Sequence, residues 1–464
     1  MTDADVTMDL HPMPAAGQAR NWAFPSPERG GLPTGLPVLR CHRPGQQLVA
    51  VEICLDAPLD AEPDGLDGIA TIMVRALSQG ARQHSAEAFA AELERCGATL
   101  QASADFLGAR VSLEVPASRL RRALGLLTEA LAEPSFAPTE IERLVRNRLD
   151  AIPIELANPG QRAAIQLARE LFPGSARMSR PRQGTAETVS RIDAAAVRAF
   201  YEAQLRPVTA SAVVVGDLTG VDVDGVLAGT LGSWATAAGA PALVPPVTAR
   251  DDGRIVIVDR PGAVQTQVLI GRLGPDRHDP IWPALVLGTY CLGGTLTSRL
   301  DRVLREEKGY TYGVRAATQV LHSPAPDSGI GAALLAIAGS VDTAATRPAL
   351  DDLRTVLRTL AADGLTDAER DLAVQNLVLV APLRYETSEP VADTLADQVQ
   401  QHLPDDFQAQ LYACLAETST AEATAAVVTA FPEDRMVTIL VGDAAQIKTP
   451  VEDLGIGPVS VVAA

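Results

Sequence analysis

Apolar residues recur with a helical period in several parts of the chain. Between residues 85 and 96 they occupy positions i, i+3, i+4 and i+7, which predicts a helix with one buried face. The members of this stripe are Ala86, Phe89, Ala90 and Leu93. A similar stripe runs from Leu296 to Leu304, with Arg and Asp residues between its members. Thr366 and Glu369 form a capping-box pair ahead of an apolar run, which predicts another helix start.

Continuous apolar runs predict buried strands, and two of these runs show that the chain repeats itself. Residues 212–215 and 437–441 are each followed by Gly-Asp, and the two Asp residues lie 226 positions apart, almost half of the chain. Two further pairs lie at similar offsets. Glu142-Arg143 matches Glu369-Arg370 at an offset of 227, and Asn158-Pro159 matches Glu389-Pro390 at an offset of 231.

The predicted elements follow one order in both halves. In the first half, we predict strands over residues 49–56, 99–105, 109–115 and 208–217, and helices over 65–78, 85–96 and in a series from 118 to 204. In the second half, we predict strands over residues 254–259, 265–272, 311–320, 329–338 and 437–443, and helices over 281–291, 297–306 and from there to residue 430.

Strands grouped between groups of helices are typical of an α+β fold. We therefore predict two homologous domains, at residues 31–234 and 251–464, each a mostly antiparallel sheet with helices packed on one face. Residues 235–250 are rich in Ala, Pro and Gly and are the predicted linker. Residues 1–30 contain several prolines and are expected to form an irregular N-terminal arm.

Composition limits the classes of function. The chain has 464 residues, of which 47% are hydrophobic and 21% charged, as is typical of a globular protein. Its net charge of −18 argues against nucleic acid or an anionic membrane as the main partner and is more compatible with basic peptides. No signal peptide and no run of 18 apolar residues is present, so we expect a cytoplasmic protein without a membrane span. The five cysteines are far apart, which argues against a disulfide framework.

The residues alone indicate no self-contained catalytic centre. The six histidines form no H-x-x-x-H, H-E-x-x-H or H-x-x-E-H pattern, so no motif for a zinc site is present. His84 with Glu87 lacks a second histidine, and it is better explained as a helix start or a surface pair. Gly293-Gly294 is a weak signal for a phosphate-binding turn, because two glycines alone are common.

One segment combines residues that suit catalysis. Arg305 lies near the end of a predicted helix, Tyr312 lies early in the next predicted strand, and Gly309 allows the chain to reverse between them. A guanidinium and a phenol are both hydrogen-bond donors, so together they could hold a peptide carbonyl or an oxyanion. The alternative is an exposed arginine that packs its stem and a tyrosine at a sheet edge.

The chain resembles the pitrilysin/insulinase family of zinc metallopeptidases, which includes the mitochondrial processing peptidase. The most specific match is the segment 292–314, with LGG, SRL, RE and GYTYGV in family order. Residues 68–80 are similar, without gaps, to the family's G-x-A-H-x-x-E-H-x-x-x-x-G helix. Further matches are LERCGA at 93–98, PSF at 134–136 with IER at 141–143, and the strand ends Gly216-Asp217 and Gly442-Asp443.

The departures from the family pattern concern the metal. Where the family has two His ligands and a catalytic Glu, this chain has Thr71, Arg75 and Val74. The family's third ligand is a Glu on a later helix, and Ala151 stands at that place; Asp150 and Glu155 would reach it only with a shift in register. The resemblance therefore implies a subunit that binds no metal and has no catalytic residues of its own. An independent zinc peptidase with displaced ligands is the least favoured alternative.

The resemblance also implies a role for the retained pair. In the family, an Arg/Tyr pair at the spacing of Arg305 and Tyr312 lies on the half or subunit without zinc and reaches the active site of the other. We therefore expect a clam-like half-chamber that pairs with a homologous H-x-x-E-H subunit, which holds the zinc, and acts on short unfolded peptides. The alternative is a structural or peptide-binding scaffold of the same fold with no part in catalysis.

Overall fold

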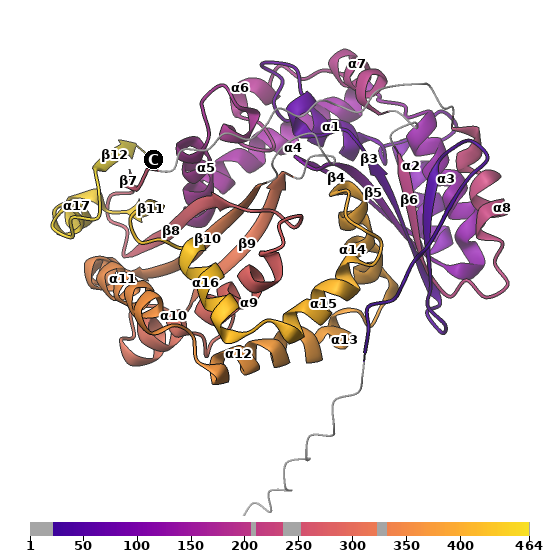
Figure 1. Ribbon diagram of the computed structural model, residues 1–464. Helices are drawn as coiled ribbons and strands as arrows, with labels where there is room; N and C mark the ends of the chain where they lie inside the picture. The colour runs from indigo at the N-terminus through magenta and orange to yellow at the C-terminus, as the bar shows by residue number, and fades with distance from the viewer. Residues whose placement is uncertain (1–21, 206–209, 235–251, 323–331, 464) are drawn as a thin grey trace, which may run out of the picture.

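The computed structural model describes residues 22–205, 210–234, 252–322 and 332–463. Two six-stranded sheets dominate it (Figure 1). The strands of the first sheet are β1 (Glu28–Gly31), β2 (Pro37–His42), β3 (Leu48–Leu55), β4 (Thr99–Asp105), β5 (Gly108–Pro116) and β6 (Ser211–Gly216). The strands of the second sheet are β7 (Arg254–Asp259), β8 (Gln265–Gly274), β9 (Val314–His322), β10 (Ala332–Asp342), β11 (Val437–Gly442) and β12 (Val459–Ala463).

The two sheets share the topology of five strands. Their strand orders are β1-β2-β6-β3-β5-β4 and β12-β7-β11-β8-β10-β9. The first edge strands differ, because β1 precedes β2 in the chain and is antiparallel to it, whereas β12 follows β11 and is parallel to β7. The pairs β2–β6, β7–β11 and β7–β12 are parallel, and the other seven pairs are antiparallel. The predicted α+β class, with two homologous and mostly antiparallel units, is confirmed.

Helices follow the strands in both halves. Those of the first half are α1 (Ile69–Ala76), α2 (Ala86–Cys96), α3 (Leu120–Ala132), α4 (Pro138–Ala157), α5 (Pro159–Leu171), α6 (Ala186–Val189), α7 (Ala194–Gln204) and α8 (Val223–Ala228). Those of the second half are α9 (Trp282–Gly293), α10 (Arg299–Asp301), α11 (Thr346–Asp363), α12 (Asp367–Val374), α13 (Ala381–Arg384), α14 (Ser388–Gln400), α15 (Phe407–Glu417), α16 (Thr420–Ala430) and α17 (Ala444–Glu452). A π-helical turn over residues 302–307 extends α10.

The repeated Gly-Asp sequence closes the same turn in both sheets. Asp217 follows β6, and one of its carboxylate oxygens accepts a hydrogen bond from the backbone N–H of Gly45 at 2.8 Å. Asp443 follows β11 and accepts from the N–H of Gly262 at 3.0 Å. Both glycines have positive φ, 85° and 76°, which glycine adopts without steric cost. Hydrogen bonds from Thr219 and Gly45 lower the pKa of Asp217 to about 2.

One helix of each half packs on the sheet of the other half (Figure 1). Helix α5 lies against β8 and β11, and its buried Ala163 and Leu167 join a core cluster with Val256 and Ile439 of the second sheet. Helix α14 lies in the same way against β3 and β6. Asn158-Pro159 and Glu389-Pro390, which match in the repeat, lie at the starts of these two helices. Each sheet is therefore covered by helices of its own half and by one helix from the other half, α14 on the first sheet and α5 on the second.

Several element boundaries differ from the predicted ones. The first helix starts at Ile69 and not at residue 65, because Gly68 has φ 101°, outside the helical region. The strand expected from residue 311 starts at Val314, because the Thr311 hydroxyl bonds the N–H and C=O of Gly313 in a local turn. Strands β1, β2 and β12 were not predicted, and β1 includes the last residues of the segment 1–30 that was expected to be irregular.

Some predictions lie outside the described residues. These are the linker 235–250, residues 1–21 of the arm, and residues 208–209 and 329–331 of two predicted strands.

From Trp22 onward the chain packs on the second half: the ring of Trp22 stacks on Tyr385 at a centroid distance of 5.7 Å, and Phe24 meets the same ring edge-on at 4.9 Å.

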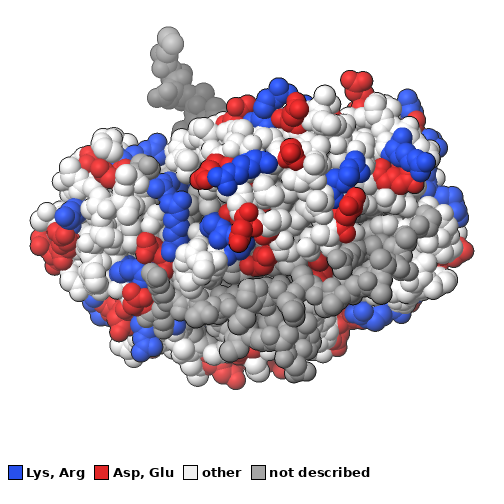
Figure 2. Space-filling model, turned by 90° about the horizontal axis from the view of Figure 1, so that it is seen from above, with Lys and Arg blue, Asp and Glu red and all other residues white. Residues whose placement is uncertain are grey.

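Acidic and basic side chains lie next to one another on the face seen from above (Figure 2). The excess of acidic residues does not form a separate patch on this face.

Among the described helices, none has the length and the apolar character that crossing a membrane requires. All five cysteines are free thiols, as expected from their spacing.

Candidate functional site

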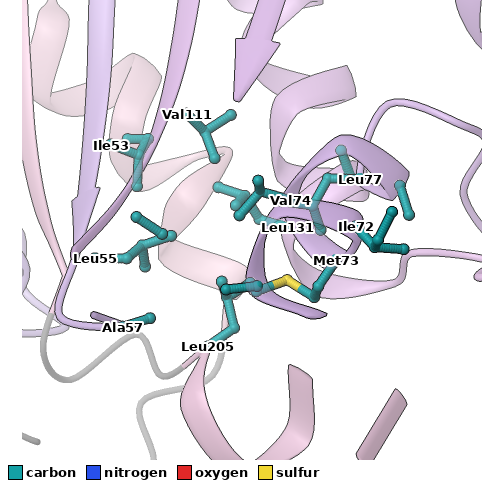
Figure 3. Packing of buried hydrophobic residues seen from close by; sticks show 14 of the residues in the cluster. Ile53, Leu55, Ala57, Ile72, Met73, Val74, Leu77, Val111, Leu131 and Leu205 are labelled. Atoms are coloured by element: carbon teal, nitrogen blue, oxygen red, sulfur yellow. The ribbon is translucent and has the colours of Figure 1, made fainter. Parts of the chain in front are cut away.

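Helix α1 carries the positions at which the resembled family has its zinc-binding motif. Seven of its eight residues are buried, and only Arg75 is exposed. Thr71 is 7% exposed and Val74 is 0% exposed. Val74 packs among Leu131, Val111 and other core side chains between α1 and the first sheet (Figure 3). The position therefore serves packing, because valine has no group that could take a proton from a water molecule.

The start of α1 is held by a buried network of charges. The Glu62 carboxylate accepts hydrogen bonds from the backbone N–H groups of Gly68 and Ala70, both at 3.0 Å. Its second oxygen lies 2.7 Å from the Arg177 guanidinium, whose side chain is 5% exposed. Asp67 lies 3.4 Å from Arg177. Burial raises the pKa of Glu62, and the neighbouring Arg177 opposes that rise.

Helix α4 carries the position of the family's third ligand. Ala151 is half-buried there and has no donor atom to offer a metal. On the same helix face, Arg148 lies one turn before it and Glu155 lies one turn after it. These two side chains form a bidentate ion pair with N–O distances of 2.5 and 2.9 Å. Glu155 is thus already paired with Arg148, and Asp150 is exposed. Neither carboxylate takes the place of the family's third ligand at Ala151.

The donor set on α1 and α4 does not fit zinc. Of the three ligand positions, Ala151 offers no ligand atom, Thr71 offers only a neutral hydroxyl, and Arg75 carries a positive charge that would repel a cation. Among the residues that the structure describes, no group of three or more His, Cys, Asp or Glu side chains could hold a metal ion. We therefore assign no metal chemistry to this chain's own residues.

The second candidate region is the turn between α10 and β9, which we call the Arg/Tyr turn (residues 302–313). Its base is held by buried charges. Arg299 forms a bidentate ion pair with Glu369, with N–O distances of 2.6 and 2.7 Å. Asp301 is fully buried, accepts a hydrogen bond from the backbone N–H of Val314 at 2.7 Å, and pairs with Arg315. The two ends of the turn are thus fixed to each other.

The chain reverses within the turn at Gly309, as predicted. This glycine has φ 66°, and its N–H donates to the C=O of Arg305 at 3.0 Å. The next residue, Tyr310, donates from its backbone N–H to the C=O of Leu304 at 2.9 Å. Arg305 belongs to the π-helical turn over residues 302–307, a rare geometry that is frequent at functional sites.

Of the two candidate side chains of the turn, Tyr312 faces solvent and Arg305 is partly exposed. Tyr312 is 92% exposed and lies two residues before β9, not early in the strand as predicted. The Arg305 side chain is 36% exposed, and its nearest carboxylate is that of Glu306 at 3.9 Å. At this exposure the Tyr312 ring and hydroxyl are accessible for contact with another molecule.

Comparison with known proteins supports the resemblance found in the sequence. Residues 38–164 match the model of the insulinase peptidase family M16, and residues 191–377 match the M16 inactive-domain model. An uncharacterized zinc protease of Mycobacterium tuberculosis is 28% identical over 371 residues, which cover 79% of this chain and 82% of that protein. One of Streptomyces coelicolor is 25% identical over 358 residues, 75% of each chain.

Solved structures share the fold. A peptidase M16 inactive domain from Pseudomonas fluorescens has a TM-score of 0.79 at 22% identity, covering 90% of this chain and 98% of that one. A protease from Helicobacter pylori has a TM-score of 0.79 at 17% identity, covering 90% of this chain and all of that one.

Proposed function

The chain belongs to peptidase family M16, and we propose that it is the zinc-free subunit of a two-chain metallopeptidase. The observation that carries this proposal is the contrast between two of its sites. Thr71 and Val74, two positions of the zinc motif, lie in the core. In the Arg/Tyr turn, hydrogen bonds hold the base, and the Tyr312 side chain is 92% exposed.

Arg305 and Tyr312 suit a role in a neighbouring active site. Both side chains donate hydrogen bonds, and neither has to change its protonation state to do so. Donors held in place before the reaction stabilise the charge that develops on a peptide carbonyl oxygen. In the proposed complex these two residues bind the substrate carbonyl, and the homologous partner carries the H-x-x-E-H motif and the zinc.

The proposed substrate is a short, unfolded peptide. Two clam-like subunits that face each other enclose a chamber, and such a chamber excludes folded proteins while it admits extended chains. We place the complex in the cytoplasm. In this proposal the isolated chain cleaves no peptide.

Reconstitution with the partner tests the proposal. The partner to test is a homologous chain with an H-x-x-E-H motif, sought first in the neighbouring reading frame. Peptide cleavage should require both chains, and metal analysis should find zinc that follows the partner and not this chain. Full activity of the partner alone would favour a scaffold without part in catalysis. Stoichiometric, tightly held zinc in the isolated chain would contradict the proposal.

A further inference from the structure

A cavity of about 460 Å³ lies between the two halves of the chain. Helices α4 and α5 and the segment 172–183 of the first half line one side of it, and strands β8, β9 and β10 of the second half line the other. A volume of this size falls within the range of roughly 300–1,000 Å³ that small-molecule sites occupy. The cavity includes Arg148 and Glu155, the pair that flanks Ala151 on α4.

The second sheet gives the cavity an apolar wall. Leu269, Leu321 and Leu334 contribute side chains from three neighbouring strands, and Phe106 contributes from the β4–β5 turn. Such a wall gains free energy when it is covered by an apolar group, at about 25 cal/mol per Å² removed from water.

The opposite wall carries three guanidinium groups, from Arg148, Arg180 and Arg182. Two of these arginines already have partners: Arg148 pairs with Glu155, and Arg180 lies 2.7 Å from Asp67. Glu155 is the one carboxylate that lines the cavity within the described part of the chain. The lining therefore has an excess of positive charge, in a protein whose net charge is −18.

Arg182 is the cation that remains available. It is exposed, and its guanidinium lies over the Phe106 ring at 5.8 Å from the centroid. No carboxylate within residues 22–205, 210–234, 252–322 and 332–463 lies within ion-pair distance of it. Asp105, on which Arg182 acts electrostatically, already accepts a hydrogen bond from the N–H of Leu107 at 2.8 Å.

We propose that this cavity binds a carboxylate attached to an apolar group. The apolar group covers the leucine wall, and the carboxylate accepts charge-assisted hydrogen bonds from Arg182. Two sources supply this chemistry: the hydrophobic C-terminal residue of a peptide, and a free short-chain carboxylic acid. The site lies within one chain, so binding there requires no partner subunit and does not depend on the proposed function.

The test uses the isolated full-length chain and two labelled decapeptides of one sequence, both ending in Leu. One has a free C-terminal carboxylate and the other a C-terminal amide. We expect the free carboxylate to bind at least about tenfold more tightly, because a hydrogen bond to a charged group is lost in the amide. Competition by N-acetyl-leucine and hexanoate distinguishes the sources: displacement by hexanoate alone indicates the free acid, and displacement by N-acetyl-leucine indicates the peptide terminus.

Three variants locate the binding. Arg182→Gln should weaken binding of the free-carboxylate peptide about tenfold and leave that of the amide unchanged. Ala164→Trp, at an exposed position of the lining, should weaken both by filling the cavity. Arg347→Gln removes an exposed arginine outside the cavity and is the matched control.

Equal affinity for acid and amide, no binding of either, or equal losses in the Arg182 and Arg347 variants would overturn the proposal. Because all of these measurements are made without the partner, their failure leaves the result of the reconstitution experiment unaffected.

Discussion

Helix α1 and the Arg/Tyr turn differ in how their side chains are used. In α1, every residue except Arg75 is buried, and Val74 is fully enclosed by the core. In the turn, buried charges fix only the base, while Tyr312 and part of Arg305 face solvent. The comparison teaches that α1, at the position of the family's metal motif, contributes to the stability of this chain through its buried side chains, whereas the exposed Tyr312 contributes little to that stability. Substitutions at the two sites should therefore have opposite effects on folding and on activity.

The largest effect is expected at Val74. Val74→Glu places an ionisable group among apolar core residues without a partner, so unfolding free energy should fall by about 4 kcal/mol. Urea denaturation followed by circular dichroism measures the change. Arg75→Glu, on the next and exposed residue, is the control and should change stability by less than about 0.5 kcal/mol. Unchanged stability of Val74→Glu would show that the position is open to water.

The next effect concerns the charges that hold the start of α1. Arg177→Met leaves buried Glu62 and Asp67 without this partner, and unfolding free energy should fall by about 3 kcal/mol. The same substitution at Arg95, whose side chain is 66% exposed and pairs with Glu92, should cost less than about 1 kcal/mol. Equal losses in the two variants would mean that the network around α1 is no stronger than a surface pair.

A third effect depends on pH and concerns the contact of α14 with the first sheet. Burial raises the pKa of Glu52 to about 7 from 4.5, although Ser112 donates a hydrogen bond to its carboxylate at 2.5 Å. The Glu52 carboxyl therefore binds its proton more tightly in the folded state than in the unfolded state. The resulting contribution to the free energy of unfolding is complete below pH 4.5 and is lost as the pH rises through about 7.

Glu52→Gln removes this dependence. Relative to the variant, the natural chain should lose roughly 2 to 3 kcal/mol of unfolding free energy between pH 4.5 and 8. Glu142→Gln, at an exposed carboxylate, should follow the natural chain at each pH. Parallel curves for the natural chain and Glu52→Gln would contradict the raised pKa.

The smallest effect on stability is expected in the Arg/Tyr turn. Tyr312→Phe should change the unfolding free energy by less than about 0.5 kcal/mol, because the Tyr312 side chain is 92% exposed. Arg305→Ala should cost less than about 1 kcal/mol, because the nearest carboxylate, that of Glu306, lies 3.9 Å from the guanidinium. Thermal unfolding of the isolated chain measures this. A loss comparable to that at Arg177 would give these residues a structural role and weaken the contrast with α1.

Much of the fold could be predicted from local patterns. The repeated Gly-Asp sequence located two equivalent strands, β6 and β11. The structure shows why the sequence repeats: each Asp carboxylate accepts a hydrogen bond from a glycine N–H in the turn that follows the parallel neighbouring strand, β2 or β7. The exchange of α5 and α14 could not be predicted, because their apolar faces do not identify the sheet that they cover. Strand β12 was missed because it is a short edge strand with exposed side chains.

The candidate site was predicted in part. The reversal at Gly309 between Arg305 and Tyr312 followed from local sequence, since glycine alone adopts positive φ easily. The Glu62–Arg177 pair joins residues 115 positions apart, and no periodic pattern connects them. The ion pair between Arg148 and Glu155 could have been predicted, because residues seven apart lie on the same face of a helix.

The central claim is that this chain supplies Arg305 and Tyr312 to a partner's active site. The most direct test measures kcat/KM of the reconstituted two-chain peptidase with Arg305→Ala or Tyr312→Phe in this chain, together with the affinity between the chains. The account predicts that kcat/KM falls by about 2–4 kcal/mol of transition-state stabilisation while the affinity between the chains stays the same. An intact complex of either variant with unchanged kcat/KM would contradict it.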